Sequence, residues 1–461
     1  MYGWLVPHII FPLHERVTRH NFWSGFLELR ELQWRSPKEL EARSFHKLSH
    51  LVSHAYENVP YYRELFETSG IKPHDLTSTS DLAFFPVTTR FDLRRNYPDK
   101  VIASNLDPGR RVVNRTSGST GSPFEFYADL GGMDLVRSSY LLFWDWAGIG
   151  PWTPEVRIAN SAHFFCQSPQ KDFATRTARR ILMGERHLLL HGADLTLAEF
   201  RDRVHSFSAG GQYYVWSFSS YAKRLASQIV AEGTQLSRYP LVFISYAETL
   251  TPTDQELIEQ AFRCKVVNHY GLLETPFVAQ VCPDNPAVFH VNSERVIVRI
   301  VRDGGASAAP GERGRVVITD LSNYVMPFIN YDTGDLAVAG ARCHCGRGLP
   351  TVERIEGRMS EAIQTPMGNI VPSPTLQAFL NNVCLALPHI WEYQAVQTAM
   401  DRVVLRIVPT SSFTPTVSAK LKKDLEEFLG PGLAVAVEAV SKIEFEPSGK
   451  RPLIKSELTA R

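Results

Sequence analysis

The chain has 461 residues, which is too long for one ordinary hydrophobic core, so we expect a large domain and at least one smaller domain. Hydrophobic residues make up 44% of the chain and charged residues 21%, which are the proportions of a globular protein. The 49 Lys and Arg residues against 48 Asp and Glu give a net charge of +1. This balance gives no electrostatic reason to expect nucleic acid or an anionic membrane as the main partner.

The sequence contains no apolar stretch long enough to span a bilayer. The apolar opening at 4–13 contains His8 and two prolines and has no basic residue before it. We expect it to be a docking segment, with contact to a membrane surface as the alternative. Six unevenly spaced cysteines do not make a disulfide scaffold in a chain of this length, and they indicate a reducing compartment. We therefore expect a cytoplasmic protein.

The first predicted elements are helical, because residues 38–67 carry apolar side chains at helical spacing and are interrupted at Pro60. Further along, runs of β-branched and apolar residues alternate with helical patterns. This alternation predicts an α/β architecture with a sheet that is at least partly parallel. The predicted strands are 156–159, 213–216, 241–244, 265–268, 295–301 and 315–319, and the helices between them include 197–207, 221–232 and 253–262.

Turn residues at 303–312 separate the last two of these strands and indicate a hairpin-type connection. The character of the sequence changes near Gly357, after which the pattern is that of a compact α+β unit. We therefore predict a large α/β domain with mixed sheets at 1–357 and a small α+β domain at 358–461. The elements predicted in the small domain are a helix at 373–384, a strand at 402–408, a charged helix at 417–429 and a strand at 434–440.

A run of glycines and hydroxyl side chains stands at 114–123. Glycine lets the backbone approach a phosphate, and N–H groups and hydroxyls can donate to its oxygens, so this run can hold a polyphosphate. It lacks the Gly-Lys-Ser/Thr ending of a Walker A loop. Such clusters are more often plain surface loops, so the phosphate interpretation depends on further motifs. The candidate phosphate-binding residues are Thr116, Ser117, Gly118, Ser119, Thr120 and Gly121.

Five further motifs follow this loop in order, at 245–248, 269–274, 331–335, 356–358 and 447–450. The ordered set resembles the core motifs of the adenylate-forming superfamily, which includes acyl-CoA synthetases, peptide-synthetase adenylation domains and luciferase. Within it, the sequence is most similar to the phenylacetate-CoA ligase family and its capsule-biosynthesis-associated relatives. That similarity runs from about residue 48 nearly to the end, and it includes Asn-Val-Pro-Tyr-Tyr at 58–62, Phe-Phe-Pro-Val-Thr-Thr-Arg at 84–90 and Cys-Gly-Arg-Gly-Leu-Pro at 345–350.

The resemblance implies a two-step reaction. A carboxylic acid, which we expect to be aryl, attacks ATP to give acyl-AMP and pyrophosphate, and a thiol, expected to be CoA, then takes the acyl group. Glu274 would coordinate Mg²⁺, and Lys450 would reach into the site from the small domain, which rotates between the steps. Lys455 competes for the role of Lys450, and Ser360 stands where the superfamily usually has Asp or Lys at its hinge.

The same resemblance implies how the nucleotide is held. The loop at 116–121 would bind the β- and γ-phosphates, while Asp335 would accept hydrogen bonds from the ribose hydroxyls. The motif residues also have ordinary alternatives: Tyr270 could be a core aromatic, Glu274 a helix-start carboxylate and Asp335 a turn residue. The remaining implied contacts are Ala247 and Glu248 beside the adenine, Tyr270 stacked on it with Gly271 next in the same motif, and Arg358 on the nucleotide.

By analogy, the acid pocket is lined by segments rich in aromatic side chains, which suits a flat aryl or other apolar acid. Two histidines in these segments could bind a polar substituent, although a core histidine with satisfied hydrogen bonds is the commoner case. The predicted lining residues are Tyr140, His163, Phe164, Trp216, His269 and Pro276.

A metal site is predicted from cysteines and a histidine in two separate turns. Cys343 and Cys345 flank His344, and Cys282 and His290 lie upstream. Three thiolates and one imidazole form a tetrahedral zinc set, and the phenylacetate-CoA ligase family has the same pattern as a structural zinc site. We predict a closed, non-catalytic zinc site at Cys282, His290, Cys343 and Cys345. His344 is the rival fourth ligand, and buried free cysteines are the plain alternative.

Three functions remain open at this point. The first is formation of an acyl- or aryl-CoA thioester. In the second, the adenylate passes to a carrier protein or an amine. In the third, the protein is a non-catalytic nucleotide-binding relative in polysaccharide biosynthesis.

Overall fold

A computed structural model describes residues 2–115, 124–159, 187–192, 194–207, 211–358, 361–386, 390–444 and 452–458. Several predicted residues lie outside these ranges, so the structure does not test them. They are the loop at 116–121, His163, Phe164, Ser360 and Lys450.

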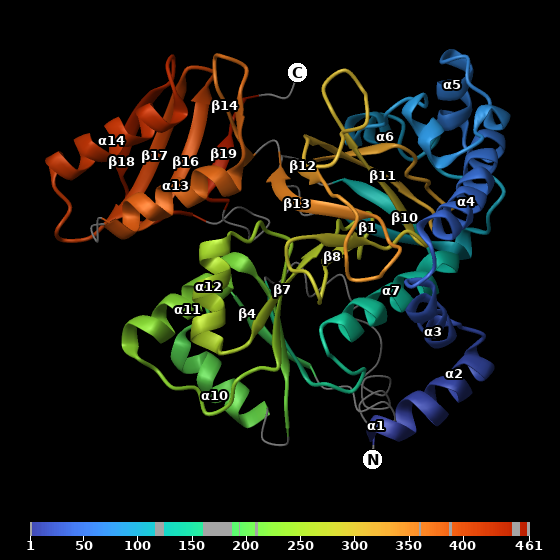
Figure 1. Cartoon of the computed structure of the whole chain (residues 1–461), viewed down its shortest axis with the longest axis horizontal. Helices are drawn as coiled ribbons and strands as arrows, with labels where there is room; N and C mark the ends of the chain where they lie inside the picture. Colours follow the sequence, from blue (N-terminus) through green and yellow to red (C-terminus); the bar gives the residue numbers. More distant parts are fainter. Residues whose placement is uncertain are drawn as a thin grey trace.

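The N-terminal part of the chain is helical (Figure 1). Helix α4 (Pro37–Asn58) starts with a capping box in which Ser36 and Glu39 bond each other's backbone N–H groups. It ends before Pro60, where α5 (Pro60–Thr68) begins, so the predicted interruption is confirmed. No helix in the described ranges combines the length and apolar character that a membrane crossing needs. The other elements here are α1 (Tyr2–Leu5), η1 (Val6–Ile10), α2 (Phe11–Thr18), α3 (Phe22–Leu32), η2 (Pro73–Asp75), η3 (Thr79–Ala83), α6 (Arg90–Arg95) and η4 (Pro108–Arg110).

An 11-stranded sheet forms the centre of the part of the chain before residue 359, in the order β10-β11-β12-β13-β9-β8-β7-β6-β5-β3-β4. The strands from β4 to β7 are parallel, and the pairs from β7 to β10 are antiparallel. This confirms the partly parallel sheet and the hairpin between β10 and β11. The strands are β3 (Glu155–Ala159), β4 (His187–His191), β5 (Tyr214–Phe218), β6 (Val242–Tyr246), β7 (Lys265–Tyr270), β8 (Ala279–Val281), β9 (Phe289–Val291), β10 (Val296–Val301), β11 (Arg313–Asp320), β12 (Tyr331–Ala339) and β13 (Thr351–Arg358).

Helices cover both faces of the parallel part of the sheet (Figure 1). The predicted helices are confirmed as α10 (Leu197–Phe207), α11 (Ser219–Glu232) and α12 (Pro252–Phe262), and they pack on one face. Helix α7 (Met133–Trp146) packs on the other face together with α3. A separate hairpin of β1 (Arg111–Arg115) and β2 (Glu125–Asp129) precedes α7. The short helix η5 (Leu130–Gly132) connects β2 to α7. The predicted phosphate loop connects the two strands of this hairpin in the sequence.

The C-terminal part has its own four-stranded sheet, in the order β18-β17-β16-β19, and its own hydrophobic core (Figure 1). Each element predicted here overlaps an observed one. Strands β14, β15, β16 and β19 were not predicted, and the domain boundary near Gly357 stays a prediction. The elements are β14 (Ile363–Gln364), β15 (Ile370–Val371), α13 (Ser373–Ala386), β16 (Ile390–Ala399), β17 (Arg402–Pro409), α14 (Pro415–Leu429), β18 (Ala434–Ala439) and β19 (Ile454–Ser456).

Candidate functional site

Three of the predicted nucleotide-binding residues come together from three strands. Tyr270 ends β7, and its hydroxyl donates to Asp335 Oδ2 on β12 at 2.7 Å. Arg358 ends β13 directly opposite Asp335, and its Nε lies 3.6 Å from Asp335 Oδ1. Burial opposes the charge on Arg358, but the attraction of Asp335 raises the pKa of Arg358 above its usual value. The cluster therefore joins a tyrosine hydroxyl, a carboxylate and a guanidinium from three strands.

Glu274 is held by a second group of residues beside this cluster. Its side chain is 2% exposed, and its Oε1 accepts from Arg90 Nη2 at 2.9 Å and from the Tyr331 hydroxyl at 3.5 Å. Arg90 begins α6 immediately after the cap Thr89, whose Oγ1 accepts from the Asp92 N–H. Sequence reasoning gave no role to Arg90 or Tyr331, although both stand in motifs that carry the resemblance.

Two backbone positions near the cluster require special geometry. A Cβ on Gly271 would lie 2.8 Å from the Phe277 nitrogen, so only glycine fits there without a shift. Ala247 has φ of 63°, in the left-handed region. Glu248 accepts from the Ser220 N–H at 2.8 Å and from the Ser220 hydroxyl at 3.1 Å, at the first turn of α11. Glu248 therefore has a structural role, and its place beside adenine stays a prediction.

The described residues of the predicted acid pocket lie together in one aromatic wall. The ring of Tyr140 on α7 is 6.2 Å from that of Trp216 and 5.4 Å from that of Phe277, which follows Pro276. The His269 ring lies 5.1 Å from Phe277. Burial, and then the nearby Arg295, lower the pKa of His269 to about 3, so its imidazole is neutral.

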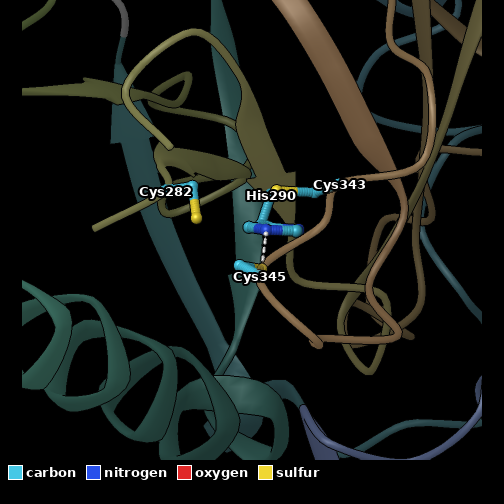
Figure 2. A group of neighbouring side chains, drawn as sticks. All are labelled: Cys282, His290, Cys343 and Cys345. Atoms are coloured by element: carbon cyan, nitrogen blue, oxygen red, sulfur yellow. Dashed lines mark hydrogen bonds between the residues drawn. The ribbon is translucent and has the colours of Figure 1, made fainter. Parts of the chain in front are cut away.

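The predicted metal ligands converge on one point (Figure 2). Cys282 follows β8, His290 lies in β9, and Cys343 and Cys345 lie between β12 and β13. Their four ligand atoms are within 4.8 Å of one another, with His290 Nε2 3.2 Å from Cys345 Sγ. Zn–S bonds of 2.3 Å in a tetrahedron require sulfurs about 3.8 Å apart, so the group fits zinc. His344 is exposed and is not part of this group.

The protonation of His290 also suits a metal ligand. Burial, and then Arg347, lower the pKa of His290 to about 4. Its imidazole is therefore neutral near pH 7, which is the form that binds metals. Burial also raises the pKa of Cys282 to about 12, so a metal would have to displace a proton from this thiol.

Comparison with known proteins gives the class first. The structure superposes on 2-hydroxyisobutyryl-CoA ligase in the postadenylation state with a TM-score of 0.71, covering 89% of this chain and 88% of that one at 19% identity. The N-terminal part therefore has the fold of an adenylate-forming ligase.

Sequence comparison then places the chain among particular relatives. It is 24% identical to the phenylacetate-coenzyme A ligase of Thermus thermophilus, over 92% of this chain and 96% of the ligase. It is 22% identical to Protein CapK of Staphylococcus aureus, over 95% and 93% of the two chains. Residues 363–457 match the CapK C-terminal domain. The chain is thus homologous to phenylacetate-CoA ligases and to CapK, as the motifs had suggested.

Proposed function

We propose that this protein is an acid–thiol ligase that activates an aryl carboxylic acid with ATP and transfers the acyl group to CoA. A carboxylate oxygen of the acid attacks the α-phosphorus of ATP, and the P–O bond to pyrophosphate breaks. The sulfur of CoA then attacks the carbonyl carbon of the acyl-AMP. The thiol proton is lost, AMP leaves, and a thioester is formed.

The observation that carries this proposal is the cluster of Tyr270, Asp335 and Arg358. Each residue stands in a different superfamily motif, and the fold brings them within hydrogen-bond or ion-pair distance. An unreactive core would gain little from placing a carboxylate and a guanidinium side by side within the fold, because burying charges is costly. In the proposed function, Asp335 binds the ribose hydroxyls and Arg358 holds its carboxylate in place.

Glu274 would supply a carboxylate oxygen to Mg²⁺, which prefers hard oxygen ligands. When bound, this ion offsets negative charge on the phosphates. Arg90 and Tyr331 hold the Glu274 carboxylate in a single orientation, and Arg90 adds positive charge to this side of the site. Because the protein needs no nucleophile of its own, positioning and charge account for the chemistry that its residues perform.

The same proposal includes a structural zinc ion at Cys282, His290, Cys343 and Cys345. The support is the donor set, three sulfurs and one nitrogen within 4.8 Å, which leaves no ligand position for a substrate. The site would connect the β8–β9 turn to the loop that enters β13. We also propose a domain boundary near Gly357, supported by the CapK match that begins at residue 363, and a location in the reducing cytoplasm.

The test is ATP–pyrophosphate exchange across a panel of aryl and other apolar acids, followed by measurement of CoA consumption. Exchange with at least one acid, and CoA-dependent thioester formation with that acid, are expected. The variant Asp335→Ala should lower exchange at least tenfold, because one charge-assisted hydrogen bond to ATP contributes about 1.5–3 kcal/mol. Asp424→Asn, on the surface of α14, is the matched control and should leave exchange unchanged.

The other outcomes decide between the alternatives. Pyrophosphate exchange without CoA consumption, but with transfer of the acyl group to an amine or a carrier protein, would show that CoA is not the acceptor. A folded protein that neither exchanges with any acid nor binds ATP would be a non-catalytic relative, and the ligase proposal would be wrong.

A further inference from the structure

The loop between β7 and β8, residues 271–277, carries Glu274 and ends at Phe277 of the aromatic wall. The Val278 N–H donates to the Tyr270 carbonyl at 3.1 Å and closes the loop at its base. Phe277 has φ of 56°, in the left-handed region that a bulky side chain rarely adopts. A non-glycine residue in this region costs free energy, so contacts from outside the loop are needed to maintain its conformation.

A buried arginine from a later part of the chain makes such a contact. Arg295, directly before β10, is 1% exposed, and its Nη1 donates to the Pro276 carbonyl in the loop. Its Nη2 lies 3.0 Å from Oδ2 of Asp320, the last residue of β11. The other oxygen of Asp320 accepts from the Ser322 N–H at 2.8 Å and from the Ser322 hydroxyl at 2.5 Å. The guanidinium therefore joins β11 to the loop through one carboxylate and one carbonyl.

The charge of Arg295 also acts on the residue that leads into this part of the chain. Burial lowers the pKa of His269, and the positive charge of Arg295 lowers it further. His269 lies in β7, and its ring is 5.1 Å from that of Phe277 at the end of the loop. Arg295 thus influences both sides of loop 271–277, at His269 before it and at Pro276 within it.

Stability alone does not explain why an arginine occupies this position. Burial lowers the pKa of Arg295 although Asp320 opposes this, so the position disfavours the charged form relative to water. Apolar side chains of similar volume are often as stabilising as a buried ion pair, or more so. They cannot donate to the Pro276 carbonyl, whereas a planar guanidinium can bond a carboxylate and a carbonyl at the same time. The arrangement is therefore suited to fixing the loop.

We infer that Arg295 is a positioning residue for the first half-reaction, and that it holds loop 271–277 in the conformation that presents Glu274 to Mg²⁺. The inference rests on the proposed function. Because Arg295 is 1% exposed, it acts through the loop and not by contact with ATP or the acid. Without its hydrogen bond, the left-handed turn at Phe277 would relax, and the Glu274 carboxylate would shift even though Arg90 still binds it.

The test uses Arg295→Lys, which keeps a positive charge but loses the planar group that bonds two partners. The Mg²⁺ concentration for half-maximal pyrophosphate exchange should rise at least about tenfold, since a misplacement of about 1 Å can cost about 10²-fold. The KM for CoA, measured with supplied acyl-AMP, should stay unchanged. In the protein without nucleotide, the backbone amides of 271–278 should exchange hydrogen for deuterium faster than in the wild type.

Arg347→Lys is the matched control, because Arg347 is another buried arginine with two side-chain partners. It bonds Gln33 and Asp284, which lie outside the loop. This variant should lose stability as a buried arginine does, but it should leave the Mg²⁺ requirement and the deuterium exchange of 271–278 as they are in the wild type. A general loss of stability and a specific loss of loop position are thereby distinguished.

A second variant applies if Arg295→Lys does not fold. Arg295→Met combined with Asp320→Asn removes both charges and leaves no uncompensated one, so the protein should fold, while the Pro276 carbonyl still lacks its donor. It should show the same rise in Mg²⁺ requirement and the same faster deuterium exchange. If both quantities are unchanged in either folded variant, the positioning role is wrong and the ligase proposal stands. If the wild-type protein catalyses pyrophosphate exchange with no acid, the proposed function itself is contradicted.

Discussion

Glu274 forms one ion pair among the residues that the structure describes. Its carboxylate is almost fully buried, and Arg90, from an element 184 residues earlier in the chain, is the only side chain that forms an ion pair with it among the described residues. A buried carboxylate without such a partner would lose hydration and gain little in return. The site thus ties α6 to the loop that follows β7.

Arg90→Met should therefore destabilise the fold. Loss of the cation leaves the Glu274 carboxylate buried and unpaired, which we expect to lower the free energy of unfolding by about 3 kcal/mol in urea denaturation. The double variant Arg90→Met with Glu274→Gln should recover at least half of that loss, because the uncompensated charge is gone. Arg203→Met, in an exposed pair with Glu199, should change stability by about 0.5 kcal/mol or less. A double variant as unstable as the sum of the two singles would contradict this account.

The buried His269 should make the stability of the protein depend on pH. Its pKa falls from 6.5 to about 3 on burial, so the unfolded chain binds more protons than the folded protein between these values. The free energy of unfolding should hence be highest above pH 6.5 and decline as the pH falls toward 3. Urea denaturation at pH 7.5 and pH 5 should show a smaller loss for His269→Gln than for the wild type. The exposed His205→Gln should lose as much as the wild type, and equal losses in all three proteins would refute the assignment.

At the scale of elements, the strands were predictable where apolar and polar residues alternate or where apolar residues follow one another, as at 241–244 and 265–268. Strand β16 was missed because its central position depends on buried amides. Gln394 donates to the Pro452 carbonyl and Gln397 donates to the Gln364 carbonyl, and these partners are far away in the sequence. A local pattern counts such residues as solvent-facing polar positions. Strand β19 has only three residues, too few for a periodic signal.

The site was predictable to the extent that it consists of motifs. Tyr270, Asp335 and Arg358 were named because each stands in a recognisable run, and the fold then joins them. Two arginines were missed, namely Arg90, which pairs with Glu274, and Arg157, which lies over the Trp216 ring. Arg90 is on helix α6 and 184 residues before its partner, and Arg157 meets Trp216 because β3 and β5 are neighbours in the sheet, so neither contact follows from the local sequence. An arginine in a motif can face solvent or a buried carboxylate, and only the tertiary contacts decide.

The proposed zinc site makes a prediction about the elements that it joins. Purified protein should contain close to one equivalent of zinc, and Cys345→Ser should lower both the metal content and the melting temperature, because bound metal stabilises the folded state. Cys264→Ser is the matched control, since this cysteine lies outside the four-residue group and should leave both quantities unchanged. Fully folded wild-type protein with less than roughly half an equivalent would remove the zinc proposal.

At the scale of the whole molecule, the proposed reaction would need two sheets that have separate hydrophobic cores. The 11-stranded sheet carries the cluster at Asp335, while the catalytic lysine is predicted in the C-terminal part, whose match to the CapK C-terminal domain extends to residue 457. Rotation of a small domain between two steps would let one site serve two half-reactions with different requirements.

The variant Lys450→Ala tests whether the lysine serves only the first half-reaction. It should abolish pyrophosphate exchange but spare thioester formation from supplied acyl-AMP, because the lysine is needed only while charge develops at the α-phosphate. Lys455→Ala is the comparison, since Lys455 lies in β19 opposite Val396 and is part of the small sheet. If pyrophosphate exchange survives in Lys450→Ala and is lost in Lys455→Ala, the catalytic lysine is Lys455 and not Lys450.

The order of strands around the metal ligands has a consequence for how the protein is made in the cell. Strand β13 lies between β12 and β9, although β9 is synthesised before both. Cys282 and His290 therefore leave the ribosome first, and the loop with Cys343 and Cys345 arrives later to insert β13 beside β9. With zinc bound as proposed, the ion would guide this insertion. A cell short of zinc would then translate the same amount of chain but obtain less folded ligase, so the flux through the reaction would follow the metal supply.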